Sequence, residues 1–230
     1  MIALCRTISL TALLLLAPHL SLAAVMSSAD YHYKLSTPSG WVQVPASELI
    51  LFKATLPPQA AHLIYDAAIQ RQDRGWFEYP YVVIMVTPPQ VTHISRLPTE
   101  SEFDSFVRGI SGGKLISKLG DVSSSIQDPR MRQTSSSFIA SLSKTTVQVD
   151  LAHRKYSFVV DVADPSHGSL TALIIGFFTP DGGVVQLNAY SRTPEFAGDV
   201  EYFTSIADSF SSTATPSPGV LYLASHSKKS

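Results

Sequence analysis

The stretch Leu170–Tyr190 reads LTALIIGFFTPDGGVVQLNAY and contains two apolar runs joined by a turn. The first run, Leu170–Phe178, is almost uniformly apolar, which is typical of a central strand that is covered on both faces. The dipeptide Asp181-Gly182 between the runs suits the positive φ angles of a tight hairpin. We therefore predict that Leu170–Phe178 and Val184–Tyr190 form a hairpin of two strands at the centre of a sheet.

Upstream of this pair, Tyr156–Ala163 is another apolar run and predicts a further central strand. Before it, Val147–Leu151 alternates between apolar and polar residues, which is the period of a strand with one buried face. The segment Ser117–Ser136 is polar and contains Asp128-Pro129. Clusters of such residues favour turns, so we predict a long exposed loop there.

An amphipathic helix is predicted between Thr99 and Gly112-Gly113. The Thr99 hydroxyl and the Glu102 side chain stand three residues apart, so each can bind a free backbone N–H of the other in a capping box. The glycine pair ends the helix. Apolar residues recur at a helical spacing and form one face, made by Phe103, Phe106, Val107 and Ile110.

A second amphipathic helix is predicted downstream of the hairpin. Thr193 is its cap and Pro194 its first helical residue, a position where the missing N–H of proline costs nothing. The helix should lie on the sheet, since its apolar residues form one stripe. These residues are Phe196, Val200, Phe203, Ile206, Ala207 and Phe210.

The amino-terminal half predicts short extended segments. Tyr33–Leu35 and Trp41–Val44 are separated by a turn signal of proline, serine and glycine. The runs His62–Arg71 and Tyr79–Thr87 look like the two strands of a second hairpin. A helix over Leu63–Gln70 remains an alternative interpretation of the first run.

These elements predict an α/β fold of the α+β type, in which helices flank a mainly antiparallel β-sheet. Hydrophobic residues make up 45% of the chain and charged residues 15%, so there is enough apolar surface for a core. We expect one domain over residues 31–210, a flexible segment over 24–30 and a disordered tail over 211–230. The tail is rich in serine, threonine and proline, which is typical of linkers.

Residues 1–23 have the pattern of a signal peptide. Arg6 precedes the apolar run Ile8–Ala17, and Ser21-Leu22-Ala23 places small residues at the sites that a signal peptidase recognises. We predict cleavage after Ala23 and a periplasmic or secreted protein, whereas a retained membrane anchor is the alternative. Cleavage removes Cys5, the only cysteine, so the mature chain would have no thiol chemistry and no disulfide.

Charge and motifs exclude several function classes. The formal charge is −1, and a balanced charge gives no attraction to nucleic acid. The Gly-x-Ser-x-Gly pattern around Ser111 formally matches a nucleophile elbow, but that motif needs a strand before the serine and here a helix precedes it. Asp161, Asp164 and His167 could hold a divalent cation, although ordinary turn chemistry explains them better. We predict no catalytic site, no metal and no cofactor.

The segment Arg74–Tyr79 is the predicted partner-binding site. Its residues Arg74, Trp76, Phe77, Glu78 and Tyr79 combine three aromatic rings with a guanidinium in a hairpin connection. Tryptophan, tyrosine and arginine are the residues that most often anchor protein interfaces. The alternative is that the aromatic side chains fold back and cover one end of the core.

The order of elements resembles the PsbP-like superfamily, the fold of the photosystem II accessory protein PsbP and of bacterial periplasmic DcrB-like proteins. The similar residues are the opening Pro38–Trp41, the pair Asp66–Gln70 and Tyr79–Val83, and the closing Gly182–Tyr190 with Tyr202–Phe210. The resemblance implies an antiparallel sheet flanked by helices and a role in binding other proteins. It supplies no catalytic or metal site, and the polar segment Ser117–Ser136 departs from it.

The leading hypothesis is therefore a non-enzymatic exported protein that binds a protein partner in the cell envelope, as an accessory or immunity-type protein, without stable membrane insertion after cleavage. One alternative is a carrier of a small ligand or lipid that uses a cavity between sheet and helices. The other is an unrecognised hydrolase. Family analogy and missing motifs carry the first hypothesis, and both are indirect.

Overall fold

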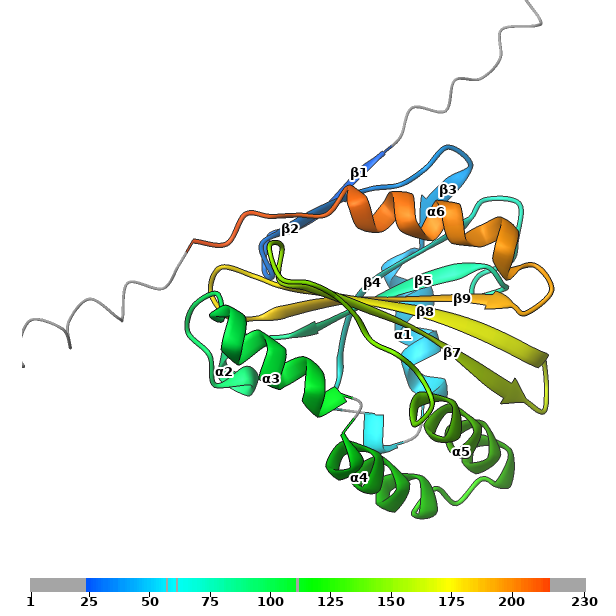
Figure 1. Cartoon of the computed structure of the whole chain (residues 1–230). Helices are drawn as coiled ribbons and strands as arrows, with labels where there is room; N and C mark the ends of the chain where they lie inside the picture. The colour runs from blue at the N-terminus through cyan, green and yellow to red at the C-terminus, as the bar shows by residue number, and fades with distance from the viewer. Residues whose placement is uncertain (1–23, 57, 61, 111, 216–230) are drawn as a thin grey trace, which may run out of the picture.

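The computed structural model describes residues 24–56, 58–60, 62–110 and 112–215, and its centre is a seven-stranded sheet (Figure 1). All neighbouring strands are antiparallel, in the order β3-β4-β5-β9-β8-β7-β6. The predicted α+β class with a mainly antiparallel sheet is confirmed. The strands are β3 (Trp41–Gln43), β4 (Ile64–Arg71), β5 (Tyr81–Thr87), β6 (Gln148–Asp150), β7 (Lys155–Asp164), β8 (Gly168–Phe178) and β9 (Val184–Arg192).

The predicted central hairpin is formed by β8 and β9, which pair along their whole length. The Thr179 N–H donates to the Gly183 carbonyl at 2.9 Å and closes the turn. Gly182 has a φ of +92°, and a Cβ at this position would overlap the backbone carbonyl of Ile94. Glycine is therefore needed at position 182 for both its conformation and its lack of a side chain.

One face of the sheet is covered by helix α6 (Phe196–Asp208) and by a small three-stranded sheet (Figure 1). This second sheet consists of β1 (Val25–Ser28), β2 (Tyr33–Ser36) and β10 (Ser211–Ser212). The helix docks its apolar side on the sheet, as predicted. Its buried apolar residues are Phe203, Ile206 and Ala207.

The predicted start of this helix is wrong. The first helical residue is Phe196, preceded by Glu195, which makes no side-chain cap. Thr193 instead continues the strand pairing, because its N–H donates to the Ser169 carbonyl at 3.0 Å. Its hydroxyl lies within hydrogen-bond distance of the Thr171 hydroxyl, at 3.1 Å, and is not aimed at the helix.

The other face is covered in part by helix α3 (Glu100–Ile110). The predicted capping box is confirmed: the Glu102 N–H donates to the Thr99 hydroxyl at 3.3 Å, and the Thr99 N–H donates to the Glu102 carboxylate at 2.7 Å. Phe103 and Val107 are buried against the sheet. This half of the face is one apolar core between α3 and the strands β7 and β8.

The prediction of a loop over Ser117–Ser136 is wrong, because the segment lies in helices α4 (Gly113–Ser124) and α5 (Pro129–Leu142). Asp128 is the cap of α5, and its carboxylate accepts from the Arg130 N–H at 2.7 Å. The Asp-Pro pair therefore begins a helix here and does not make a turn. The Ser124 hydroxyl donates to the Asp121 carbonyl at 2.7 Å, and the hydroxyls of Ser123 on α4 and Ser136 on α5 are hydrogen-bonded at 3.2 Å, so serines also join the two helices.

Three further elements were not predicted: α1 (Ala46–Thr55), η1 (Pro58–Ala60) and α2 (Pro89–Thr92). The run His62–Arg71 contains strand β4, so its hairpin interpretation is confirmed and the helical alternative is wrong.

Strand β6 lies at the edge of the sheet and pairs with β7. The alternation around it predicted a buried face, but Val149 is 42% and Leu151 41% exposed, and only Val147 of this face packs against the core.

The ends of the described chain also correct the predicted domain limits. Residues 25–28, expected to be flexible, pair with β2 as strand β1, and residues 211–212 of the expected tail pair with β2 as β10. Residues 1–23 and 216–230 lie outside the described part, so the leader and the remainder of the tail stay predictions. Within the described residues no helix has the length and apolar character needed to cross a membrane.

Candidate functional site

The loop that joins β4 to β5 contains the predicted partner-binding residues, and the side chain of Gln70 fixes its backbone. Gln70 is fully buried. Its amide nitrogen donates to the carbonyls of Arg74 at 3.2 Å and Gly75 at 3.0 Å, and its carbonyl accepts from the Phe77 N–H at 2.7 Å. A buried amide must be hydrogen-bonded, so one side chain holds the loop in a single shape.

The structure divides the predicted residues into two groups. Trp76 is 43% exposed, and Arg74 and Glu78 are also exposed. Phe77 instead turns inward, with a φ of +60° and its ring stacked on Phe52 at a centroid distance of 4.2 Å. The predicted site thus has two parts. Its exposed edge consists of Arg74, Trp76 and Glu78, and its aromatic base is the Phe77 ring stacked on Phe52.

Further aromatic rings connect the loop to strands β5 and β9 of the large sheet. Tyr79 stacks on Tyr81 at 5.2 Å, and Tyr81 contacts Tyr190 at the same distance. Burial raises the pKa of Tyr81 and of Tyr190 well above the ordinary value of a phenol. Burial thus favours the neutral form of both hydroxyls, and both rings pack as uncharged parts of the aromatic cluster.

The residues weighed for catalysis and metal binding form no such site where the structure describes them. Ser111 lies outside the described residues, and helix α3 precedes it, whereas a nucleophile elbow requires a strand. Asp161 accepts a hydrogen bond from the Thr171 hydroxyl at 2.8 Å, and Asp164 caps its own turn by accepting from the His167 N–H at 3.1 Å. In the described ranges no three histidine, cysteine or acidic side chains are grouped to hold a metal.

An apolar cleft of about 570 Å³ lies where α4 and α5 face the start of β4 and the turn between β7 and β8. This volume is within the range of ligand pockets, about 300–1,000 Å³. The cleft was not predicted, because the expected loop over Ser117–Ser136 overlaps both helices. Residues Leu115, Ile116, Leu119 and Val122 have helical spacing and could have revealed it. Its apolar walls come from Ala60, Leu63, Leu119, Val122, Ile126, Met131 and Pro165.

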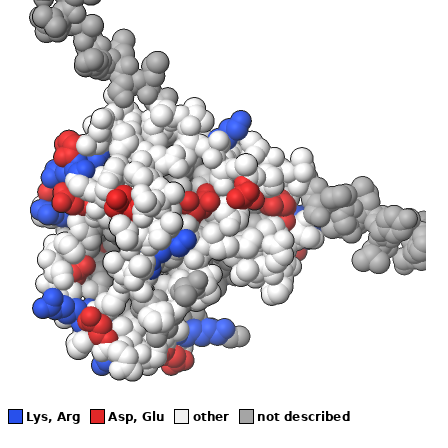
Figure 2. Space-filling view, turned by 180° about the vertical axis from the view of Figure 1, so that it is seen from behind, with Lys and Arg blue, Asp and Glu red and all other residues white. Residues whose placement is uncertain are grey.

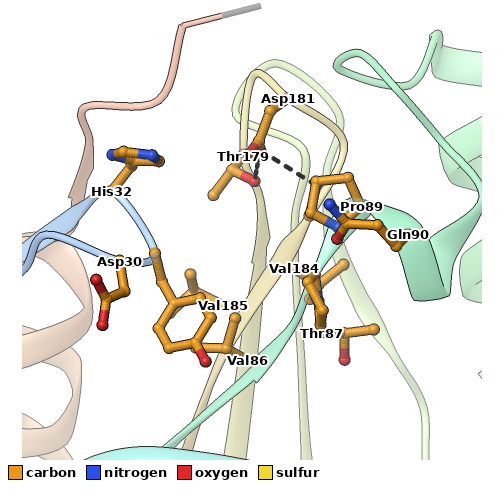
Figure 3. Close-up of a pocket in the computed structure, with 13 residues that line it drawn as sticks. Asp30, His32, Val86, Thr87, Pro89, Gln90, Thr179, Asp181, Val184 and Val185 are labelled. Atoms are coloured by element: carbon orange, nitrogen blue, oxygen red, sulfur yellow. Dashed lines mark hydrogen bonds between the residues drawn. The ribbon is translucent and has the colours of Figure 1, made fainter. Parts of the chain in front are cut away.

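A smaller hollow of about 330 Å³ lies at the carboxyl end of β5, beside Val86 and Thr87 (Figure 3). Val86 and Val185 lie on one side of it, and Asp30 and His32 border it from the loop before β2. Asp181 is engaged within its own turn, because its carboxylate accepts from the Thr179 hydroxyl at 2.5 Å. The polar groups are spread around the rim and do not converge on one point.

Charged side chains are sparse on the face shown in Figure 2. Acidic and basic groups are interspersed there among uncharged ones, and the part of this face that the structure describes has no continuous basic patch. Recognition of a phosphate backbone needs such a patch.

No family model and no curated protein matches the sequence. Several solved structures are similar, and two of them are described here. The solution structure of cyanobacterial PsbP (CyanoP) from Synechocystis sp. PCC 6803 has a TM-score of 0.43 and 12% identity, over 85% of this chain and 96% of that one. The crystal structure of LpqN, involved in cell envelope biogenesis of Mycobacterium tuberculosis, has a TM-score of 0.42 and 11% identity, over 84% and 91%.

Proposed function

We propose that the chain is a non-enzymatic exported protein that binds a protein partner in the cell envelope through the loop Arg74–Tyr79. The observation that carries this proposal is the exposure of Trp76, 43%, on a loop whose backbone is fixed by Gln70. A large aromatic side chain on a rigid loop loses little conformational freedom on binding, which is how interface anchors gain affinity.

The neighbours of Trp76 support the same role. Arg74 offers a planar guanidinium that can pair with a carboxylate or stack on a ring. Phe77 and Tyr79 hold the loop on the core through Phe52 and Tyr81, so the exposed edge is presented from a fixed base. Partner contact thus involves mainly Arg74, Trp76 and Glu78, whereas the two inner rings set the shape of the loop.

The test is affinity capture from an envelope fraction with the full chain and with Trp76→Ser. We expect the variant to lose the captured partner while its free energy of unfolding changes by less than about 0.5 kcal/mol, as is usual for surface positions. Phe77→Ser should destabilise the fold, because Phe77 stacks on Phe52. The matched control is Tyr202→Ser, an aromatic with the same exposure, 43%, on helix α6.

Retention of the same partner by Trp76→Ser would refute this use of the loop. A large loss of stability in that variant would show that Trp76 belongs to the core.

A second candidate function, carriage of a small apolar ligand, is favoured by the cleft between α4 and α5. Its volume of about 570 Å³ and its apolar walls suit a molecule with a hydrocarbon part. Native mass spectrometry of the purified protein tests this function, since a tightly held ligand adds a defined mass. Repeated recovery of the bare chain, with no binding of added apolar probes, would exclude it.

A further inference from the structure

Helix α4 leaves its apolar side open into the cleft. The helix packs mainly against α5 and α3, and Figure 1 shows it standing away from the large sheet. Leu119 is only partly buried and Val122 is 44% exposed. An amphipathic helix ordinarily buries this side, so the open side is a surface that gains stability when hydrocarbon covers it.

Arg130 is the one lysine or arginine among the described residues that line the cleft. Asp164 also lines it, and its negative charge is partly offset by two backbone donors, because its carboxylate accepts from the Ser166 N–H at 2.7 Å and the His167 N–H at 3.1 Å. The guanidinium of Arg130 is exposed and has no ion pair among the described residues. Apolar walls next to a free guanidinium match a molecule with a hydrocarbon chain and an anionic head.

We infer that the cleft between α4 and α5 binds a single-chain amphiphile with an anionic head, with the chain against Leu119 and Val122 and the head at Arg130. This inference rests on the second proposed function and adds the chemical class of the ligand.

Other occupants fit the lining less well. An extended peptide brings backbone N–H and C=O groups that need partners, and the Thr134 hydroxyl in the wall already donates to the Arg130 carbonyl at 3.1 Å. A neutral hydrocarbon would leave the guanidinium unused. The flexible side chain of Met131 in the wall adapts to chains of different shape.

The test is displacement of a fluorescent palmitate analogue from the full chain by palmitate, by palmitoyl lysophosphatidate and by hexadecanol, which has the same chain length as palmitate and no charge. We expect either anion to displace the probe at a concentration about tenfold lower than hexadecanol, the value for one charge-assisted hydrogen bond. The more effective of the two anions then identifies a carboxylate or a phosphate head.

Two variants locate the binding. Val122→Asp should abolish probe binding, with Val91→Asp as the control at a residue of similar kind, 62% exposed, on α2. Arg130→Gln should remove the preference for the anions and leave hexadecanol unchanged, with Lys53→Gln on α1 as its control. Circular dichroism of each variant verifies that the fold is intact.

The possible results distinguish the inference about the anionic head from the proposed carrier function. Equal displacement by palmitate and hexadecanol in the unmodified chain would overturn the inference about the head and leave the carrier function standing. Unchanged probe binding by Val122→Asp would show that the cleft is not the site. Failure of every probe to bind would overturn both the inference and the carrier function.

Discussion

Replacing Phe203 by alanine tests the docking of α6 on the sheet. Phe203 is 1% exposed, and its ring lies 6.0 Å from Trp41 in a T-shaped contact and 6.4 Å from Phe196. Phenylalanine to alanine changes in well-packed cores cost about 3–5 kcal/mol, because the transfer energy is lost and a cavity remains. In a domain of this size, about 2–4 °C per kcal/mol gives a fall in Tm of about 6–20 °C.

The neighbouring Tyr202 supplies a matched comparison on the same helix. It is 43% exposed and touches Trp41 at 6.0 Å, so Tyr202→Ala should remove one aromatic contact, worth about 0.5–1.5 kcal/mol. Urea unfolding followed by tryptophan fluorescence measures both variants. Equal costs for the two changes, or an unchanged unfolding midpoint for Phe203→Ala, would show that Phe203 does not hold α6 on the sheet.

Two further predictions concern the other face and the helix cap. The pKa of Glu102 is lowered from 4.5 to about 2, first by its hydrogen bond with Arg96 and then by the Thr99 N–H. The ionised carboxylate therefore stabilises the folded state fully above pH 4.5, and this contribution is lost as the pH falls toward 2. Glu102→Gln should therefore be less stable than the unmodified chain at neutral pH, and urea midpoints should converge as the pH falls through this window; a constant difference would contradict the assignment. A Cβ at Gly176 would overlap the ring of Tyr156, so Gly176→Ala should cost about 1–3 kcal/mol, and thermal unfolding should show a smaller cost in a Tyr156→Ala background.

The parts of the fold that were predicted are those whose local pattern has one solution. Leu170–Tyr190 has two apolar runs and a glycine that alone fits its turn, so its hairpin could be derived without knowledge of the rest. The capping box at Thr99 and Glu102 is likewise local and was predicted. The start of α6 was not, because a tertiary hydrogen bond from Thr193 to β8 competes with the cap.

The candidate sites, too, were predicted only where they depend on local sequence. The exposed edge at Trp76 could be proposed from composition, but the inward turn of Phe77 depends on Phe52, which lies on a helix that was not predicted. The cleft was not predicted, because the serine-rich sequence over α4 and α5 favours turns unless the helices pack together, and this outweighed the helical spacing of Leu115, Ile116, Leu119 and Val122. Local sequence patterns do not predict helices that form only because they pack against other elements.

The small sheet has a geometric consequence for any attachment to this molecule. Strands β1 and β10 flank the same strand, so the described chain both enters and leaves beside β2, on the side of the large sheet away from α4 and α5 (Figure 1). A tag, fusion or surface linkage next to β1 or β10 would attach the molecule on this side and leave α4 and α5 facing away from the attachment. New termini opened in a remote loop, with the present ones joined by a short linker, should accordingly be well tolerated.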